Sequence, residues 1–260
     1  MKYAVEIRSL TVIFSSRRGA IKALDGLNLN IKPGQVFGFL GPNGAGKTTA
    51  MHVLLGFIAP TSGEARIFGE DVSESIARQR IGYLAEHPDT YTFLTGRELL
   101  VMTGHLFLMK GKHLRFRIDE VLNQVELKEG ADRRIATYSR GMMQRICMAQ
   151  ALINDPDLVI LDEPTSGLDP FGRMGIRKII TGLRERGKTV FFSSHELSEA
   201  ELICDHIAIL SKGRIVTEGK ASDLVEAGES LEKYFMRTVC AHDEDQRSEL
   251  GDQARILREL

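Results

Sequence analysis

The segment from Gly41 to Thr49 constrains the fold of this chain more than any other. It reads GPNGAGKTT and contains the spacing G-x-x-x-x-G-K-[ST]. The residues before it, Gln35 to Leu40, are nearly all apolar, as expected of a strand that is buried on both faces. The residues after it, AMHVLLGF, have helical character. A strand, a glycine-rich loop and a helix in this order predict an α/β sheet whose loop binds a phosphate group.

Each residue type in this loop has a chemical role. Glycines let several backbone N–H groups turn toward one anion, and the helix start adds unpaired N–H donors. Lys47 supplies a positive charge for the β- and γ-phosphates of a nucleotide, and Thr48 offers a hydroxyl to Mg²⁺. The alternative is a glycine-rich turn with no ligand. The expected phosphate-binding residues are Gly41, Asn43, Gly44, Ala45, Gly46, Lys47, Thr48 and Thr49.

An acidic pair follows a second apolar strand in the stretch LVILDEP. Ligands bind at the carboxyl ends of strands in open α/β sheets, so Asp162 and Glu163 are expected to lie beside the phosphate. Asp162 is expected to hold Mg²⁺. Glu163, on the opposite side of the strand, is expected to accept a hydrogen bond from a water that attacks the γ-phosphorus. A helix N-cap or a surface pair is the structural alternative.

The remainder of the chain divides into regions of different pattern. Apolar residues at helical spacing predict a helical lobe over 87–153, inserted into an α/β core made of 1–86 and 154–220. Short strands are expected at Tyr3 to Ile7, Leu158 to Leu161, Thr189 to Ser193 and His206 to Leu210. In the last third such strands alternate with helices, which predicts a mostly parallel sheet. Residues 221–260 are expected to form a C-terminal tail, and the acidic stretch at 241–249 predicts that it is solvated.

Composition excludes several classes of protein. The chain has 34 Lys+Arg and 35 Asp+Glu, a net charge of -1, which gives no support for nucleic-acid binding. Its three cysteines form no C-x-x-C pair, which argues against a thiolate metal site. Leu99 to Met109 is too short for a membrane-spanning helix, which needs about 20 apolar residues. Glu6 and Arg8 interrupt any apolar core of a secretory signal.

A further set of motifs narrows the choice among phosphate-binding proteins. No N-K-x-D sequence is present, which weakens the GTPase interpretation, whereas YSRGM lies at Tyr138 to Met142. The acidic pair is followed by SGLD, from Ser166 to Asp169, and FFSSHE contains His195. In these motifs and their order, over about residues 4–220, the sequence resembles the ATP-binding cassette family, the motor subunits of membrane transporters.

This resemblance implies an architecture and a set of partners. The fold would be a P-loop NTPase core with a mostly parallel sheet, an N-terminal antiparallel β subdomain and an inserted α-helical subdomain. ATP and Mg²⁺ would be the cofactors, and two head-to-tail cassettes, expected to be two copies of this chain, would clamp two ATP molecules. A separate transmembrane permease would hold the chain at the cytoplasmic face of the membrane, with no direct membrane insertion and no nucleic acid.

The resemblance also assigns roles to single residues. Ser139, Arg140, Gly141 and Met142 would face the γ-phosphate bound by the other cassette, although Ser139 could be a simple N-cap. Asp169 would link the two active sites. The catalytic residues would be Glu163, His195 and Lys47, where His195 contacts the γ-phosphate and orients the glutamate and the water. A structural role is the alternative for His195.

Two further positions complete the expected nucleotide site. Phe14 would stack on adenine, or else be a packed core aromatic. Glu86 lies at the family's glutamine-loop position, so that Thr48, Asp162 and Glu86 would be near Mg²⁺. His87 to Thr95 would form a hinge and coupling surface.

An apolar patch is expected within that coupling surface. Tyr91, Phe93 and Leu94 could receive a short helix from the permease, and the alternative is that they pack internally.

Arg140 and Glu86 depart from the familiar family pattern, since they replace a glycine of LSGGQ and a glutamine. Both variants resemble the branch that is paired with export-type permeases, so ATP-driven export is the expected function.

A non-transport ATPase of the same class, acting in DNA repair or translation, is the alternative. Such proteins usually carry two fused cassettes or long coiled coils, and this chain shows neither. An unrelated phosphate-loop kinase would not explain YSRGM, and a catalytically silent regulator would not need Lys47 and Glu163.

Overall fold

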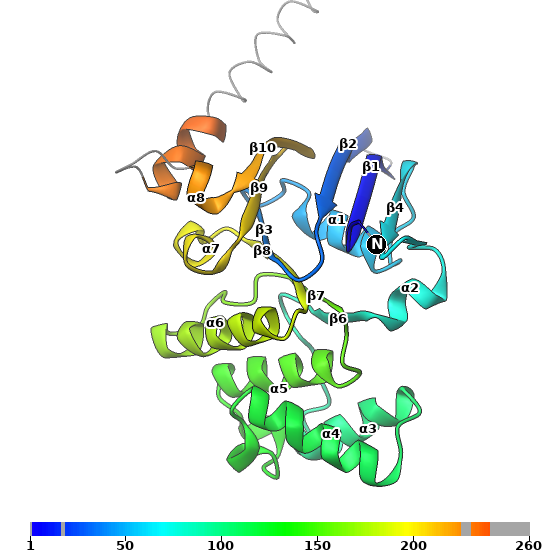
Figure 1. The fold of residues 1–260 in the computed structure, drawn as a ribbon, viewed down its shortest axis with the longest axis vertical. Helices are drawn as coiled ribbons and strands as arrows, with labels where there is room; N and C mark the ends of the chain where they lie inside the picture. The colour runs from blue at the N-terminus through cyan, green and yellow to red at the C-terminus, as the bar shows by residue number, and fades with distance from the viewer. Residues whose placement is uncertain (1, 17–18, 225–229, 240–260) are drawn as a thin grey trace, which may run out of the picture.

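The computed structural model describes residues 2–16, 19–224 and 230–239. Two sheets occupy the upper part of the molecule, and α3 (Gly96–Leu106), α4 (Gly111–Gln124) and α5 (Arg140–Leu152) form a helical lobe at its lower end (Figure 1). α6 (Pro170–Glu185) lies between this lobe and the sheets. The expected α/β fold with an inserted helical subdomain is confirmed.

The first sheet is antiparallel, as the family resemblance implies. Its strand order is β2-β1-β4-β5, with β1 at Val5–Ser16, β2 at Gly19–Ile31, β4 at Ser62–Ile67 and β5 at Glu70–Asp71. Inner and outer side chains alternate at the end of β2, where Leu27, Leu29 and Ile31 are buried. One face of this sheet therefore packs on the core and the other is exposed to solvent.

The second sheet carries the expected phosphate loop. Its order is β10-β9-β3-β8-β7-β6, and every pair is parallel except β9 with β10. The strands are β3 (Val36–Leu40), β6 (Ile81–Leu84), β7 (Leu158–Leu161), β8 (Thr189–Ser194), β9 (His206–Ser211) and β10 (Arg214–Lys220). Because β3, β7 and β8 are adjacent and parallel, their carboxyl ends meet at one edge.

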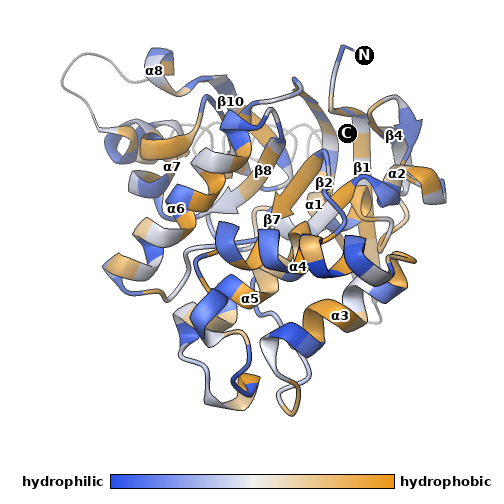
Figure 2. Ribbon diagram, turned by 60° about the horizontal axis from the view of Figure 1, so that its bottom comes forward, coloured by the Kyte–Doolittle hydropathy of each residue, from blue (hydrophilic) through white to orange (hydrophobic). Residues whose placement is uncertain are grey.

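Every residue of β3, β7 and β8 is buried, because the sheet has an apolar cluster on each face. Phe37 and Phe39 of β3 pack with the antiparallel sheet and α1 (Lys47–Leu54). Val36 and Leu40, which point the other way, belong to a cluster that includes the helical lobe and α6. Figure 2 shows the apolar residues along the interior strands. The lobe therefore shares its core with the sheet.

Two of the three lobe helices, α3 and α5, begin at a side-chain cap. A capping box precedes α3, in which Thr95 Oγ1 accepts a hydrogen bond from the Glu98 backbone at 3.2 Å and Glu98 accepts one from the Thr95 backbone at 2.8 Å. Two 3₁₀ turns, Lys128–Gly130 and Ile135–Thr137, lead to α5. The short helices α2 (Ser75–Gln79) and α7 (Leu197–Ile203) lie outside the lobe.

The start of the expected tail packs against the core. α8 (Ala221–Leu224) follows β10, and residues 231–239 are helical and lie beside β10 in Figure 1. Leu231 is fully buried and the Tyr234 hydroxyl lies 3.1 Å from that of Thr217. The expected solvated stretch at 241–249 lies outside the described residues. Within the described ranges, no helix combines the length and the apolar character needed to cross a bilayer.

Candidate functional site

The glycine-rich loop joins the end of β3 to the start of α1. Gly46 has φ 109°, and a Cβ there would lie 2.5 Å from the Ala23 carbonyl oxygen; one at Gly41 would lie 2.4 Å from that of Leu210. Only glycine fits these two positions without a shift of the backbone. No side chain caps α1, so the first N–H groups of the helix are left to a ligand.

A cavity of about 630 Å³ lies over this loop. The Lys47 side chain is buried at its base, with Nζ 2.7 Å from the Gly41 carbonyl oxygen and 3.3 Å from that of Pro42. Nζ also lies 3.5 Å from Glu163 Oε1. The cavity is lined by Ile21, Lys22, Ala23, Asn43, Gly44, Ala45, Gly46, Lys47, Thr48, Thr49, Glu86, Glu163 and Lys212.

The acidic pair follows β7, and both carboxylates are buried. Ser193 of β8 connects them: its Oγ donates to Asp162 Oδ1 at 2.5 Å and accepts from the Glu163 backbone N–H at 2.9 Å. Sequence reasoning missed Ser193. The available signal was a serine directly after the apolar run VFF, at the carboxyl end of a strand predicted to lie beside the one that carries the acidic pair.

Glu163 is fixed by contacts on both carboxylate oxygens. Oε2 lies 2.8 Å from His195 Nδ1 and accepts the His195 backbone N–H at 3.3 Å, while Oε1 faces Lys47. Its backbone has φ 49°, in the left-handed region, which costs about 1 kcal/mol or more for a residue other than glycine. Strain of this kind is typical of functional sites. The arrangement holds a carboxylate where it can accept a proton or orient a water.

Glu86 lines the cavity and is partly exposed, with Oε1 3.7 Å from His87 Nδ1. Nearby, burial and the charges of Asp162 and Glu86 raise the pKa of Tyr83 to about 12, so this phenol stays neutral.

The structure overturns one alternative for Phe14. This side chain is 43% exposed and therefore is not a packed core aromatic. It does not line the cavity itself, but it pairs across the hairpin with Ile21, which does.

The second group of expected residues lies around a separate surface cavity of about 450 Å³, which shares no lining residue with the first. Ser139 caps α5 by accepting the Met142 N–H at 3.3 Å, and Asp169 caps α6 by accepting the Gly172 N–H at 2.7 Å. The N-cap alternative for Ser139 is therefore observed. Gly141 also lines this cavity.

Arg140 covers the loop that follows the acidic pair. Its Nη2 donates to the Ser166 carbonyl at 3.2 Å, and its guanidinium lies against Gly167. Gln144 donates to the Pro164 carbonyl at 2.9 Å. The start of α5 is thus attached to the same loop that begins at Glu163.

Comparison with known proteins gives consistent results. A family model described as ABC transporter matches residues 24–166. An uncharacterised ABC transporter ATP-binding protein of Nostoc sp. is 48% identical over 207 residues, 79% of this chain and 62% of the relative. The bacitracin transport ATP-binding protein BcrA of Bacillus licheniformis is 42% identical over 84% of this chain and 70% of the relative. The Nod factor export ATP-binding protein I of Paraburkholderia xenovorans is 39% identical over 80% and 69%.

The chain spans only about three fifths of the length of the Nostoc relative and of a second uncharacterised relative from Synechocystis sp.. Among solved structures, a dimeric structure of a post-hydrolysis state of the cassette MJ0796, bound to ADP and Pi, is similar. It has a TM-score of 0.76 and 28% identity, and the match covers 84% of this chain and 98% of that one.

Proposed function

Because this chain belongs to the ABC transporter family, we propose that it binds ATP with Mg²⁺ over the loop between β3 and α1 and hydrolyses it to drive export through a separate membrane permease. The observation that carries this proposal is the position of Glu163. Its carboxylate is held by His195 and faces Lys47 on the wall of the cavity. A fixed acceptor beside a phosphate-binding lysine is what hydrolysis of the terminal phosphate requires.

The residues present fit a magnesium nucleotide. Carboxylate and hydroxyl oxygens are the ligands that Mg²⁺ prefers, and Asp162, Thr48 and Glu86 supply them. Nowhere in residues 2–16, 19–224 and 230–239 do three or more His, Cys, Asp or Glu side chains form a group able to hold a metal. The ion would therefore depend on phosphate oxygens and water for its other ligands. When bound, it would neutralise charge on the phosphates.

The protein's own groups account for the chemical steps. The loop amides and Lys47 bind the β- and γ-phosphates and stabilise the charge that develops during transfer. Glu163 accepts a hydrogen bond from the attacking water and aligns it with the γ-phosphorus. With a proton on Nδ1, His195 donates to Glu163 and fixes the direction of its carboxylate.

We infer that two copies share each ATP. The cavity at Ser139 and Asp169 opens on the surface and is separate from the phosphate loop, so one chain alone does not bring both groups to one nucleotide. A second copy, placed head to tail, would bring the start of α5, with Arg140 and Met142, to the γ-phosphate. The similar cassette MJ0796 is dimeric with ADP and Pi bound, which supports the pairing of two copies. Phe14 is proposed to stack on adenine, because its ring is exposed beside Ile21.

The permease is proposed to dock between core and lobe. A cavity of about 290 Å³ there is lined in part by Tyr83, Pro88 and Phe107. Tyr91 and Phe93 are exposed and contact each other edge to face, with ring centroids 5.8 Å apart, which supports the predicted apolar patch. A short helix of the permease would fill this groove and hold the chain at the cytoplasmic face of the membrane.

Leu94 lies on the inner side of this surface. It packs against the main apolar cluster, as the alternative interpretation of the patch predicted. Export is favoured because three matched relatives are named for Nod factor export.

Phosphate release by purified protein tests the proposal. Glu163→Gln should lower turnover about a hundredfold or more while ATP still binds. Glu86→Gln is the matched control, because it makes the same carboxylate-to-amide change on the same cavity wall and restores the family's usual residue; it should keep turnover. Full turnover in Glu163→Gln would contradict the role assigned to Glu163. Loss of turnover in both variants would show that negative charge on the cavity wall supports hydrolysis, and not the position of Glu163.

A further inference from the structure

The end of α3 and the start of α4 form an exposed tip that combines apolar and basic side chains. We propose that this tip lies on the surface of a bilayer that contains anionic lipid headgroups. The contact would be made by the chain itself, beyond any contact through a permease. The tip is defined by Leu106, Leu108, Lys110, Lys112, Arg115 and Phe116.

The apolar part of the tip protrudes from the lobe. Leu106 is 76% exposed, Leu108 82% and Phe116 69%, among the most exposed large apolar side chains of the described residues. The neighbouring Leu114 is buried instead and packs on Gly104, where a Cβ would lie 2.2 Å from Leu114 Cδ1. This contact fixes the end of α3 against α4. The three exposed side chains therefore stand on a base that is held by this packing.

The basic part of the tip is not neutralised. Residues 106–117 contain four Lys or Arg and no acid, although the whole chain has a net charge of -1. Among the side chains the structure describes, Lys110, Lys112 and Arg115 have no ion-pair partner. The charges are free to meet phosphate headgroups, and each lysine or arginine near an anionic surface strengthens binding severalfold.

The acids that follow the tip in the sequence, Asp119 and Glu120, are already paired. Asp119 pairs with Arg97 at 3.0 Å, and Glu120 pairs with Arg117 at 2.7 Å. They therefore do not offset the charge of the tip.

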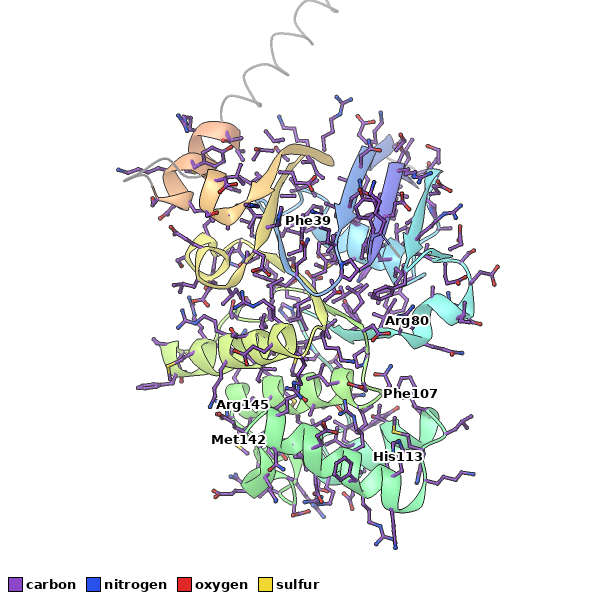
Figure 3. All side chains as sticks on the ribbon, viewed as in Figure 1. Phe39, Arg80, Phe107, His113, Met142 and Arg145 are labelled. Atoms are coloured by element: carbon purple, nitrogen blue, oxygen red, sulfur yellow. The ribbon has the colours of Figure 1, made fainter. Side chains whose placement is uncertain are left out.

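The tip lies away from the face proposed to meet the second copy. In Figure 3, Phe107 and His113 lie on the right of the lobe, whereas Met142 and Arg145 lie on its left. Phe107, between Leu106 and Leu108, lines the groove between core and lobe. If the permease docks in that groove, the tip stands beside it and faces the adjoining bilayer. This orientation rests on the proposed function, whereas the exposure and charge of the tip do not.

A flat lipid surface suits this shape better than a protein partner. Apolar contacts between proteins are concentrated in well-packed pockets from which water is excluded. Exposed apolar side chains interleaved with cations are instead typical of segments that rest in the headgroup region of a membrane. Leu108 occupies the turn itself, with φ 59°.

Sedimentation of the full chain with lipid vesicles tests the proposal. The protein should bind vesicles of equimolar phosphatidylcholine and phosphatidylglycerol, and binding should fall as salt rises. Replacing Lys110, Lys112 and Arg115 with alanine should lower the partition coefficient about a hundredfold. The control replaces Lys32, Lys128 and Lys233, which are exposed elsewhere, and should lose much less. Equal losses in both triple variants, or equal binding to pure phosphatidylcholine, would overturn the proposal.

A fluorescence probe tests whether the apolar residues enter the lipid. The chain has no tryptophan, so Leu108→Trp introduces a single reporter, and Leu202→Trp, at a position 65% exposed on α7, is the matched control. Anionic vesicles should shift the emission of the first to shorter wavelength and leave the second unchanged. Vesicle binding without that shift would contradict lipid contact and favour a purely electrostatic site for an acidic partner. ATPase activity of every tip variant should stay unchanged, so failure here is distinct from failure of the proposed function.

Discussion

Replacing Ser193 with alanine removes one hydroxyl from the buried edge between β7 and β8. That hydroxyl lies 2.5 Å from Asp162 Oδ1 and accepts the Glu163 backbone N–H at 2.9 Å. Ser193 has no exposed surface and Asp162 is 2% exposed, so bulk water cannot take its place. The substitution leaves one backbone N–H without an acceptor and one buried carboxylate oxygen without its donor.

The size of the effect follows from these two groups. An unsatisfied buried polar group costs about 1–3 kcal/mol, so the loss of two partners should lower the free energy of unfolding by about 2–6 kcal/mol. For a chain of this size, that corresponds to a loss of roughly 4–24 °C in Tm. Asp162 would also lose the contact that sets its orientation. Loss of such a supporting contact typically weakens metal binding about 10–100-fold, so ATPase activity should need correspondingly more Mg²⁺.

Thermal unfolding without nucleotide and ATPase activity against Mg²⁺ concentration measure the two effects. Ser194→Ala is the control, because Ser194 is also buried and, among the residues that the structure describes, its hydroxyl hydrogen-bonds only to the Glu196 backbone, at 2.9 and 3.2 Å. The Ser194→Ala variant should lose some stability but should reach half-maximal ATPase activity at the same Mg²⁺ concentration as the unchanged protein. Two results would refute the argument that Ser193 orients Asp162. One is an unchanged Mg²⁺ concentration for half-maximal activity in Ser193→Ala, and the other is an equal shift of that concentration in Ser194→Ala.

Three other predictions test neighbouring parts of the structure. Lys47→Ala should abolish ATP binding in a titration, because its ammonium lies at the base of the cavity; unchanged affinity would reject the assignment. Gly46→Ala should destabilise the fold and remove nucleotide binding together, since its Cβ would meet the Ala23 carbonyl at φ 109°; a soluble variant with normal ATP affinity would be the opposite result. Burial raises the pKa of Cys147 to about 12, so the reactive thiolate is scarce below that pH, and alkylation near pH 8 should stay slow until the protein unfolds; rapid labelling of the folded protein at Cys147 would argue against this burial.

The central strands were predictable from sequence because they are buried on both faces. A short apolar run with turn residues on either side is typical of an interior strand in an α/β fold. The strand at Leu158–Leu161 is observed over the predicted range. Thr189–Ser194 is one residue longer than predicted, since Ser194 is still within the ladder.

The N-terminal hairpin was predicted less well. A strand was expected at Tyr3 to Ile7, whereas β1 continues to Ser16. Register shifts along its pairing with β2 break the alternation of apolar residues on which the prediction relied. In the second half of β1, Ile13 and Phe14 are exposed although they are apolar. The alternation of apolar and polar residues that marks a half-buried strand is therefore missing there.

Motif spacing predicted which residues meet at the nucleotide site, but not how they are held. The left-handed backbone of Glu163 and the bridge through Ser193 arise from the packing of β7 against β8, which a local pattern does not contain. Ile21, Lys22 and Lys212 of the cavity wall come from other parts of the chain and carry no motif. The sequence likewise gave no sign that Leu231 returns to the core.

The mass of Glu163→Gln in solution tests most directly whether two copies share each ATP. Light scattering with saturating Mg²⁺ and ATP should show twice the mass of one chain, and ADP should return it to one. Adding Ser139→Arg should prevent the doubling without loss of ATP binding, because the arginine would block the start of α5. A nucleotide-loaded protein that keeps the mass of a single chain would contradict the account.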